Sequence, residues 1–211
     1  MASIDTSVIG SPGWWMQRLA VKLDRRRPRL ELLDRYYRGD PPLPEGAETQ
    51  KSAYQAFQRK ARTNYAQLIV EAVRHRMILT GFRTGASDDE NGDDAAATIM
   101  RINGLAVESA EIHRIMLTLG DAYAIVGLDE LNQPIITAQD PRQVVTEHDP
   151  RRQRIVRAAL NEFRDDVAGA DFRYVYLQGA PGENVQMWVA LPDLQADRPS
   201  RQRLDVATMK P

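Results

Sequence analysis

The sequence has 211 residues, no cysteine, and a formal net charge of −1 from 28 basic and 29 acidic residues. The missing cysteines exclude disulfides, thiolate-bound metals and a cysteine nucleophile. The longest apolar runs, such as residues 68–70 and 122–128, are too short for a membrane helix, and the N-terminus lacks the pattern of a signal peptide. We therefore expect a soluble intracellular chain with no membrane partner.

The small net charge hides a strong segregation of charge. Residues 1–83 carry 15 basic against 8 acidic residues, a net +7, and residues 84–149 carry 3 against 13, a net −10. Residues 150–211 carry 10 against 8, a net +2. A basic block beside an acidic one indicates surfaces that face different neighbours.

The first part of the chain has a helical pattern. Ser11 followed by Pro12 predicts a helix start, and apolar residues then recur four apart at Trp15, Leu19 and Leu23. Pro28 predicts a break, followed by a second short helix that ends at Gly39.

Three further helices are predicted before residue 120. The longest covers about residues 49–80, and an acidic loop then leads to a helix over residues 94–103 that Asp94 is expected to cap. The third covers residues 107–119 and ends at Gly120. Its inward residues are expected to be Ile112, Ile115, Met116 and Leu119.

The periodicity then changes to that of strands. Residues 122–128 and 134–138 predict one hairpin, and residues 172–177 and 185–191 predict another. Residues 144–145 suggest a short strand, and residues 155–163 fit a helix or a strand. The fold class is therefore α+β, an N-terminal helical segment followed by an antiparallel sheet. We expect a mainly helical part over residues 1–120, a β part over 121–192, and a loop or linker over 193–211.

No residues of catalytic type gather in a recognised pattern. The acidic run 88–94 fits a calcium loop poorly, because Ser87 and Thr98 occupy the positions where that loop requires acidic ligands. Its plainer interpretation is a solvated loop. The three histidines are scattered, and neither a glycine-rich nucleotide loop nor a nucleophile elbow occurs. We therefore expect no enzyme activity, no catalytic residue, no metal and no cofactor.

Two kinds of residue suggest binding surfaces instead. The arginine cluster Arg25, Arg26, Arg27 and Arg29 is a candidate for contacts with phosphates, with pairing to nearby acidic residues as the alternative. In the pairs Trp14-Trp15 and Tyr36-Tyr37, neighbours on a helix point about 100° apart, so one of each should enter the core and the other an interface. The candidates for a subunit interface are Trp14, Tyr36, Asp88, Asp89 and Asp93.

Several short stretches, in order along the chain, carry a resemblance to a known family. They are Trp14-Trp15, the stretch "LDRYYRGD" at residues 33–40 with the proline-rich residues 41–44, residues 61–65 and 68–73, residues 81–83, Asn103 and Leu105, residues 120–127, residues 140–142, and Asp149-Pro150. Over about residues 14–165 the sequence resembles the N-terminal part of a tailed-bacteriophage portal protein, of the SPP1 Gp6-like group common in actinobacterial phages.

The resemblance implies a structural protein of the virion, assembled in the cytoplasm of the host bacterium. Portal proteins form a dodecameric ring at one capsid vertex, through which double-stranded DNA is packaged and ejected. Their partners are further copies of the chain, terminase, the head–tail connector or adaptor, and the major capsid and scaffolding proteins. Residues 1–211 would correspond to the wing region, which has an antiparallel sheet and so favours a strand over residues 155–163. The arginines at positions 25–29 would contact DNA or capsid protein.

Members of this family are about twice as long, with stem, clip and crown regions after the wing. The sequence is therefore expected to be a fragment or a truncated homologue. In a ring, the basic N-terminal block of one subunit is expected to meet the acidic middle block of its neighbour. The alternative function is a phage DNA-binding or metal-dependent nuclease-like protein that uses the acidic run.

Overall fold

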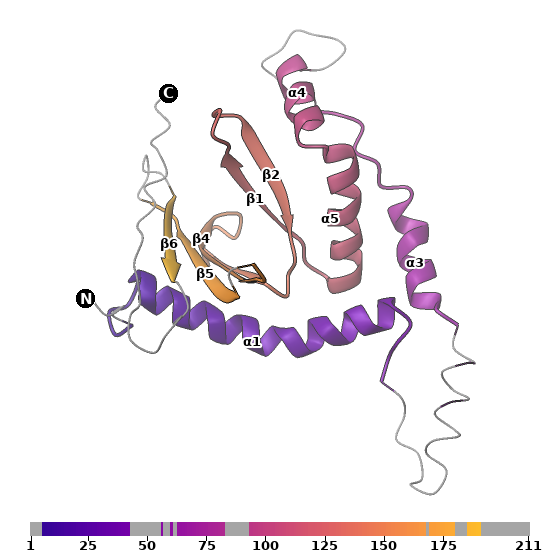
Figure 1. Ribbon diagram of the computed structural model, residues 1–211, viewed down its shortest axis with the longest axis horizontal. Coiled ribbons are helices and arrows are strands. Elements are labelled where there is room, and N and C mark those ends of the chain that lie inside the picture. Colours follow the sequence, from indigo (N-terminus) through magenta and orange to yellow (C-terminus); the bar gives the residue numbers. More distant parts are fainter. Residues whose placement is uncertain are drawn as a thin grey trace, which may run out of the picture. The chain divides into compact units, whose positions relative to one another are not determined.

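The fold is α+β, as the sequence predicts, with an N-terminal helix followed by antiparallel sheets (Figure 1). The structure is a computed structural model that describes residues 6–42, 56, 60, 63–82, 93–167, 169–179 and 185–190. Its helices are α1 (Pro12–Tyr37), α3 (Tyr65–Arg74), α4 (Asp94–Ile102) and α5 (Leu105–Leu119). Its strands are β1 (Tyr123–Leu128), β2 (Pro134–Gln139), β3 (Val144–His148), β4 (Val156–Asp165), β5 (Ala170–Leu177) and β6 (Gln186–Ala190).

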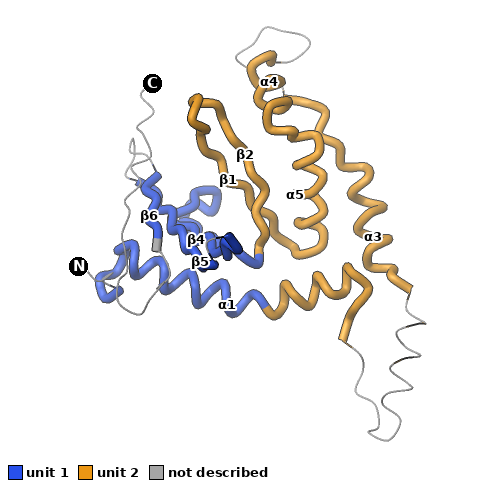
Figure 2. Tube along the Cα trace, in the orientation of Figure 1, with its two compact units in different colours: residues 1–27, 142–211 blue, residues 28–141 orange. Residues whose placement is uncertain are grey.

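The chain divides into two compact units that interleave along the sequence (Figure 2). Unit 1 combines residues 1–27 with residues 142–211, and unit 2 is the continuous segment 28–141. The change from helices to strands near residue 120 lies inside unit 2. The division of the chain at residues 120 and 192 remains a prediction.

Unit 1 is a four-stranded antiparallel sheet, in the order β3-β4-β5-β6, packed against the N-terminal half of α1. Pairing brings Leu160 opposite both Val145 and Val175, so three fully buried side chains lie in a row across the sheet. The buried core of the unit consists of Met16, Leu19, Leu23, Val145, Ala158, Leu160 and Val175. The segment 155–163 is thus a strand, and the hairpin of β5 and β6 is confirmed.

Helix α1 begins as predicted, where the Trp14 amide donates to the Ser11 hydroxyl at 3.2 Å. The predicted break at Pro28 is wrong, because α1 continues through it to Tyr37. An interior proline costs about 3 kcal/mol. Leu23 and Leu30, on either side of it, are both buried, and each buried leucine contributes roughly 1.5–3 kcal/mol. Burial on both sides therefore offsets the proline.

Gly39 ends α1 in the predicted way. Its φ is +74°, its amide donates to the Tyr36 carbonyl at 3.1 Å, and the Asp40 amide donates to the Arg35 carbonyl at 2.8 Å. These two bonds make a Schellman motif, in which a left-handed residue satisfies the last carbonyl groups of a helix.

Unit 2 is organised around α5, which packs against α3, α4 and β2. Its buried core joins Leu30 of α1 to Ile115 and Leu119 of α5. Of the four residues expected to point inward, Ile115 and Leu119 do so, whereas Ile112 is half-buried and Met116 is exposed.

Asn103, between α4 and α5, joins the hairpin β1–β2 to the helices of unit 2. Its side-chain amide donates to the Pro134 carbonyl at 2.8 Å and accepts from the Ile136 amide at 2.7 Å. In a two-stranded sheet the backbone groups along the outer edge of a strand have no strand to pair with. The Asn103 side chain satisfies one such carbonyl and one such amide of β2.

Two helix starts differ from the sequence prediction. The expected helix over residues 49–80 lies partly outside the described residues, but Asn64 caps a new helix, α3, which ends at Arg74. The Gln67 amide donates to the Asn64 side chain at 3.0 Å. For α4 the cap is Asp93 and not Asp94, since Asp93 accepts from the amides of residues 95 and 96.

Candidate interaction surfaces

A hollow on unit 1 is lined by basic side chains of α1. Trp14, Arg18, Lys22, Arg25 and Arg26 contribute to it, with Glu147 of β3 as the acidic residue among its lining. Positions 14, 18, 22, 25 and 26 share one face of a helix, because each turn has 3.6 residues. Four cations thus face one carboxylate, which gives the hollow an excess of positive charge.

Glu147 holds two of these cations in place. The Lys22 ammonium lies 2.6 Å from Glu147 Oε2 and also donates to the Thr146 carbonyl at 2.9 Å. Arg18 lies 3.7 Å from Glu147 Oε1 and 5.4 Å from the centre of the Trp14 ring. The hydrogen bond from Lys22 is the main cause that lowers the pKa of Glu147. Arg25 and Arg26 also line the hollow.

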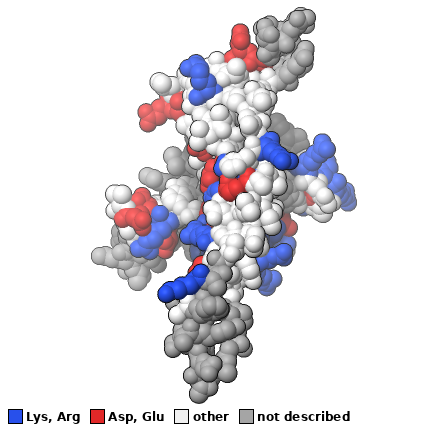
Figure 3. Space-filling view, turned by 90° about the vertical axis from the view of Figure 1, so that its right-hand side faces the viewer, with Lys and Arg blue, Asp and Glu red and all other residues white. Residues whose placement is uncertain are grey.

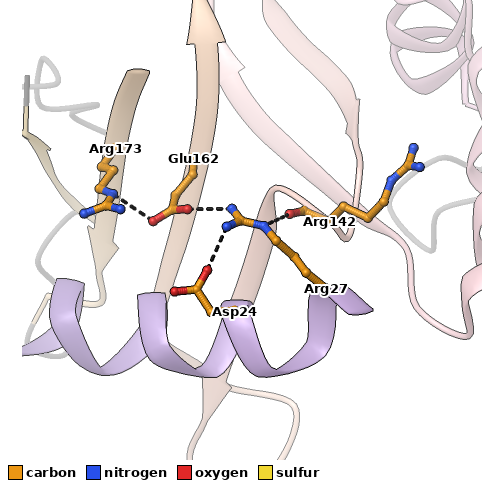
Figure 4. Close-up of polar contacts among 5 residues, drawn as sticks. All are labelled: Asp24, Arg27, Arg142, Glu162 and Arg173. Carbon is orange, nitrogen blue, oxygen red and sulfur yellow. Dashed lines mark hydrogen bonds and ion pairs between the residues drawn. The ribbon is translucent and has the colours of Figure 1, made fainter. Parts of the chain in front are cut away.

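Arg27 has a different environment from its neighbours (Figure 4). Its guanidinium contacts Asp24 at 2.7 Å and Glu162 of β4 at 2.6 Å, and its Nε donates to the Arg142 carbonyl at 3.1 Å. Glu162 is nearly buried and also pairs with Arg173 of β5 at 2.8 Å. Arg27 therefore links α1 to the sheet of unit 1.

The four predicted arginines thus fall into different settings. Arg25 and Arg26 line the basic hollow, Arg27 is engaged inside unit 1, and Arg29 is exposed on the part of α1 that belongs to unit 2. Sequence reasoning missed Arg18 and Lys22 because they lie outside the arginine run. The spacing of four residues between Trp14, Arg18 and Lys22 places all three on one helix face, and this was the signal in the sequence that could have identified them.

The two members of each aromatic pair have different surroundings, and an interface role for Trp14 and Tyr36 remains a prediction. Trp15 packs against the core of unit 1. Trp14 lines the hollow, and its ring meets the Trp15 ring edge to face, with 4.9 Å between the two ring centres. Tyr36 is exposed, and the Tyr37 hydroxyl donates to Glu71 at 2.7 Å. Of the acidic interface candidates, Asp93 caps α4, and Asp88 and Asp89 lie outside the described residues.

A polar network inside unit 2 holds α3 against α1 and α5. Glu71 accepts from Tyr37 and, at 2.7 Å, from Arg74, while Arg114 lies over the Tyr37 ring at 5.3 Å and pairs with Glu111. These donors lower the pKa of Glu71, with the Tyr37 hydroxyl as the largest cause. Burial, and then Glu71 itself, raise the pKa of Tyr37. The side of α3 that faces its own unit therefore combines these polar contacts with half-buried Ala66 and Val70.

The opposite side of α3 is apolar and exposed. Tyr65, Leu68, Ile69 and Val73, at the spacings of one helix face, are all exposed, and α3 contains no buried residue. Figure 3 views the molecule from the side on which α3 lies in Figure 1 and shows a broad area between scattered charged side chains that carries no charge. These residues belong to the segment 49–80 that the sequence predicts as a helix.

No trace of a metal centre is found in the part of the chain that the structure describes, where His, Asp and Glu nowhere gather in groups of three or more. Most of the acidic run lies outside that part. Among the described helices, none is both long and apolar enough to cross a membrane.

Comparison with known protein families gives a match. The model of the family "Phage portal protein, SPP1 Gp6-like" matches residues 17–180, which is more than three quarters of the chain. No curated protein matches the sequence significantly. The family match begins inside α1 and ends after β5, so it includes parts of both compact units. The chain therefore belongs to the SPP1 Gp6-like family of phage portal proteins.

Proposed function

We propose that the chain forms the wing of a ring-shaped portal at one vertex of a phage capsid, where DNA enters and leaves and where terminase and the head–tail connector dock. The observation that carries this proposal is the family match across residues 17–180. The basic hollow on unit 1 and the exposed apolar face of α3 in unit 2 support it, because a ring subunit must contact both its neighbours and other components.

The ring is tested by light scattering after size-exclusion chromatography of the full chain, with electron microscopy of the eluted particles. A single large species that shows a central hole is the expected result. A chain that stays monomeric over the whole concentration range, with no annular particles, would contradict the ring.

We further propose that the basic hollow on α1 contacts the phosphate backbone of DNA. Arg25 and Arg26 line the hollow together with Arg18 and Lys22, and these four cations give it the excess of positive charge that attracts phosphates. Each phosphate neutralised by such a cation releases counterions, which makes binding dependent on salt.

The variant R25E/R26E should weaken binding to a short DNA duplex by at least about tenfold and reduce the slope of log affinity against log salt by about 2. The matched control is R151E/R152E, which makes the same charge change at two exposed positions of unit 1 outside the hollow. Fluorescence anisotropy of a labelled duplex across a salt series measures both the affinity and its dependence on salt for each variant. An equal loss in the two variants would show that the hollow is not a specific contact surface.

A further inference from the structure

Glu147 lines the basic hollow on unit 1, and each of its two carboxylate oxygens faces a cation. Lys22 Nζ lies 2.6 Å from Glu147 Oε2, and the Arg18 guanidinium lies 3.7 Å from Glu147 Oε1. A DNA phosphate also presents two oxygens that share one negative charge, and lysine and arginine bind phosphates through the same charge-assisted hydrogen bonds as they do carboxylates. Glu147 therefore takes the place of a phosphate on these two cations.

The packing of unit 1 fixes this pairing. Glu147 lies on β3 opposite Ala158 of β4, which is buried in the core, and Lys22 precedes Leu23 of α1, whose side chain is fully buried. Lys22 also donates to the carbonyl of Thr146, the residue before Glu147, at 2.9 Å. Because the core holds both backbones, the carboxylate stays within reach of its cations unless its side chain rotates away. A phosphate that approaches Lys22 therefore competes with Glu147.

The competition is one that a phosphate backbone can win. The hydrogen bond from Lys22 is the largest cause that lowers the pKa of Glu147 from its ordinary value of 4.5, so the carboxylate is ionised at neutral pH and repels a phosphate while it attracts the cations. The three side chains remain partly exposed, with 27% for Glu147, 41% for Lys22 and 53% for Arg18. Ion pairs of such exposure are weak in water.

We propose that Glu147 limits the affinity of the basic hollow for DNA by competing with the phosphates for Lys22 and Arg18. The inference rests on the proposed DNA contact and concerns how strongly that contact holds. If DNA is to move past the hollow, every phosphate that binds has to be released, and a built-in anion takes the two cations back each time. Removal of Glu147 should therefore strengthen the binding of DNA.

Glu147→Gln tests the competition in the full chain, because it removes the charge and frees two cations. Each additional phosphate contact steepens the slope of log affinity against log salt by about 0.9, so we expect a slope steeper by up to about 2 and an affinity for a short DNA duplex at low salt at least about tenfold higher. The matched control is Asp166→Asn, which removes a carboxylate 3.5 Å from Arg164 in unit 1, outside the hollow, and should leave both quantities close to those of the wild type. Fluorescence anisotropy across a salt series measures the affinity and the slope.

A double variant shows whether the freed cations cause the gain. Lys22→Gln in the E147Q background should remove about half of the increase in slope, because it takes away one of the two cations that E147Q frees. An increase that K22Q leaves intact would come from net charge alone, and the proposed competition would then be wrong. Glu147→Ala, which removes the carboxylate without putting an amide in its place, should act in the same direction as E147Q and replaces it if E147Q does not fold.

The results separate this inference from the DNA contact itself. If the wild type binds the duplex and R25E/R26E weakens that binding, but E147Q binds no more tightly than the wild type, Glu147 does not compete with phosphates and the DNA contact stands. If E147Q binds more weakly than the wild type, Glu147 positions the cations for DNA, which also overturns the inference. If neither the wild type nor E147Q binds the duplex, both proposals fail.

Discussion

Arg27 allows a sharp test of how unit 1 is held together, because its three partners differ in burial. Glu162 retains only 10% side-chain exposure, whereas Asp24 retains 62%. Replacing Arg27 with Met keeps the apolar stem and removes the charge. Among the described residues Glu162 then keeps its ion pair with Arg173, and the Arg142 carbonyl loses the hydrogen bond from Arg27. We expect unit 1 to lose about 3 kcal/mol, since breaking a buried pair costs roughly 3–5 kcal/mol and Arg173 restores part of it.

The partners of Arg27 should rank by their burial. Glu162→Gln keeps a hydrogen-bonding side chain but removes the charge that Arg27 and Arg173 share, so we expect a loss of about 1–2 kcal/mol. Asp24→Asn should cost less than about 0.5 kcal/mol, because an exposed pair on a helix contributes little. The R27M/E162Q double variant should lose less than the sum of the single losses, because the two changes remove one shared contact.

The assay can report on unit 1 alone. All three tryptophans, at positions 14, 15 and 188, belong to unit 1, so tryptophan fluorescence in a urea titration follows this unit. If Asp24→Asn proved as costly as Arg27→Met, or if the losses of R27M and E162Q were simply additive, burial would not be what sets the strength of these contacts.

Two further predictions concern single residues in each unit. The pKa of Glu147 is lowered by Lys22 from its ordinary value of 4.5, so its contribution to the stability of unit 1 is complete above that value and is lost as the pH falls through the lowered pKa. Glu147→Gln should therefore flatten the acid limb of the fluorescence-monitored stability curve, and an unchanged limb would count against the pairing. Gly39→Ala places a methyl group 3.0 Å from Asn64 Nδ2 at a φ of +74°, which should destabilise unit 2 by about 1–2 kcal/mol in thermal unfolding followed by circular dichroism. Gly127→Ala, which meets nothing within 4 Å, is the control and should be close to neutral.

Local signals in the sequence predicted local structure well. A serine cap at position 11, a glycine stop at position 39 and the hairpin around residues 129–133 all depend on residues within one turn of each other. At Pro28 the local rule failed because packing on both sides of the proline outweighed its cost. At Asp93 and Asp94 two equivalent caps stand side by side, and the sequence does not distinguish between them.

Local signals could not predict which segments of the chain make up each unit. Arg27 and Glu162 are 135 positions apart, and no periodicity in either segment indicates that they meet. For the same reason the arginine run was treated as one surface, although the structure separates Arg27 from the rest. The apolar periodicity of α3 was visible, but periodicity shows only that a face needs covering and not which chain covers it.

The interleaving of the two units also has a consequence for how the chain is made. Unit 2 is continuous and can fold as soon as residue 141 has left the ribosome. The N-terminal half of α1, by contrast, is synthesised before unit 2 and packs on strands that are synthesised after it. Until then Leu19 and Leu23 have no sheet to pack on, so this half of the helix exposes its apolar side throughout the synthesis of unit 2. Unit 1 is therefore completed after unit 2, and until then the apolar side of the N-terminal half of α1 is exposed to aggregation or to chaperone binding.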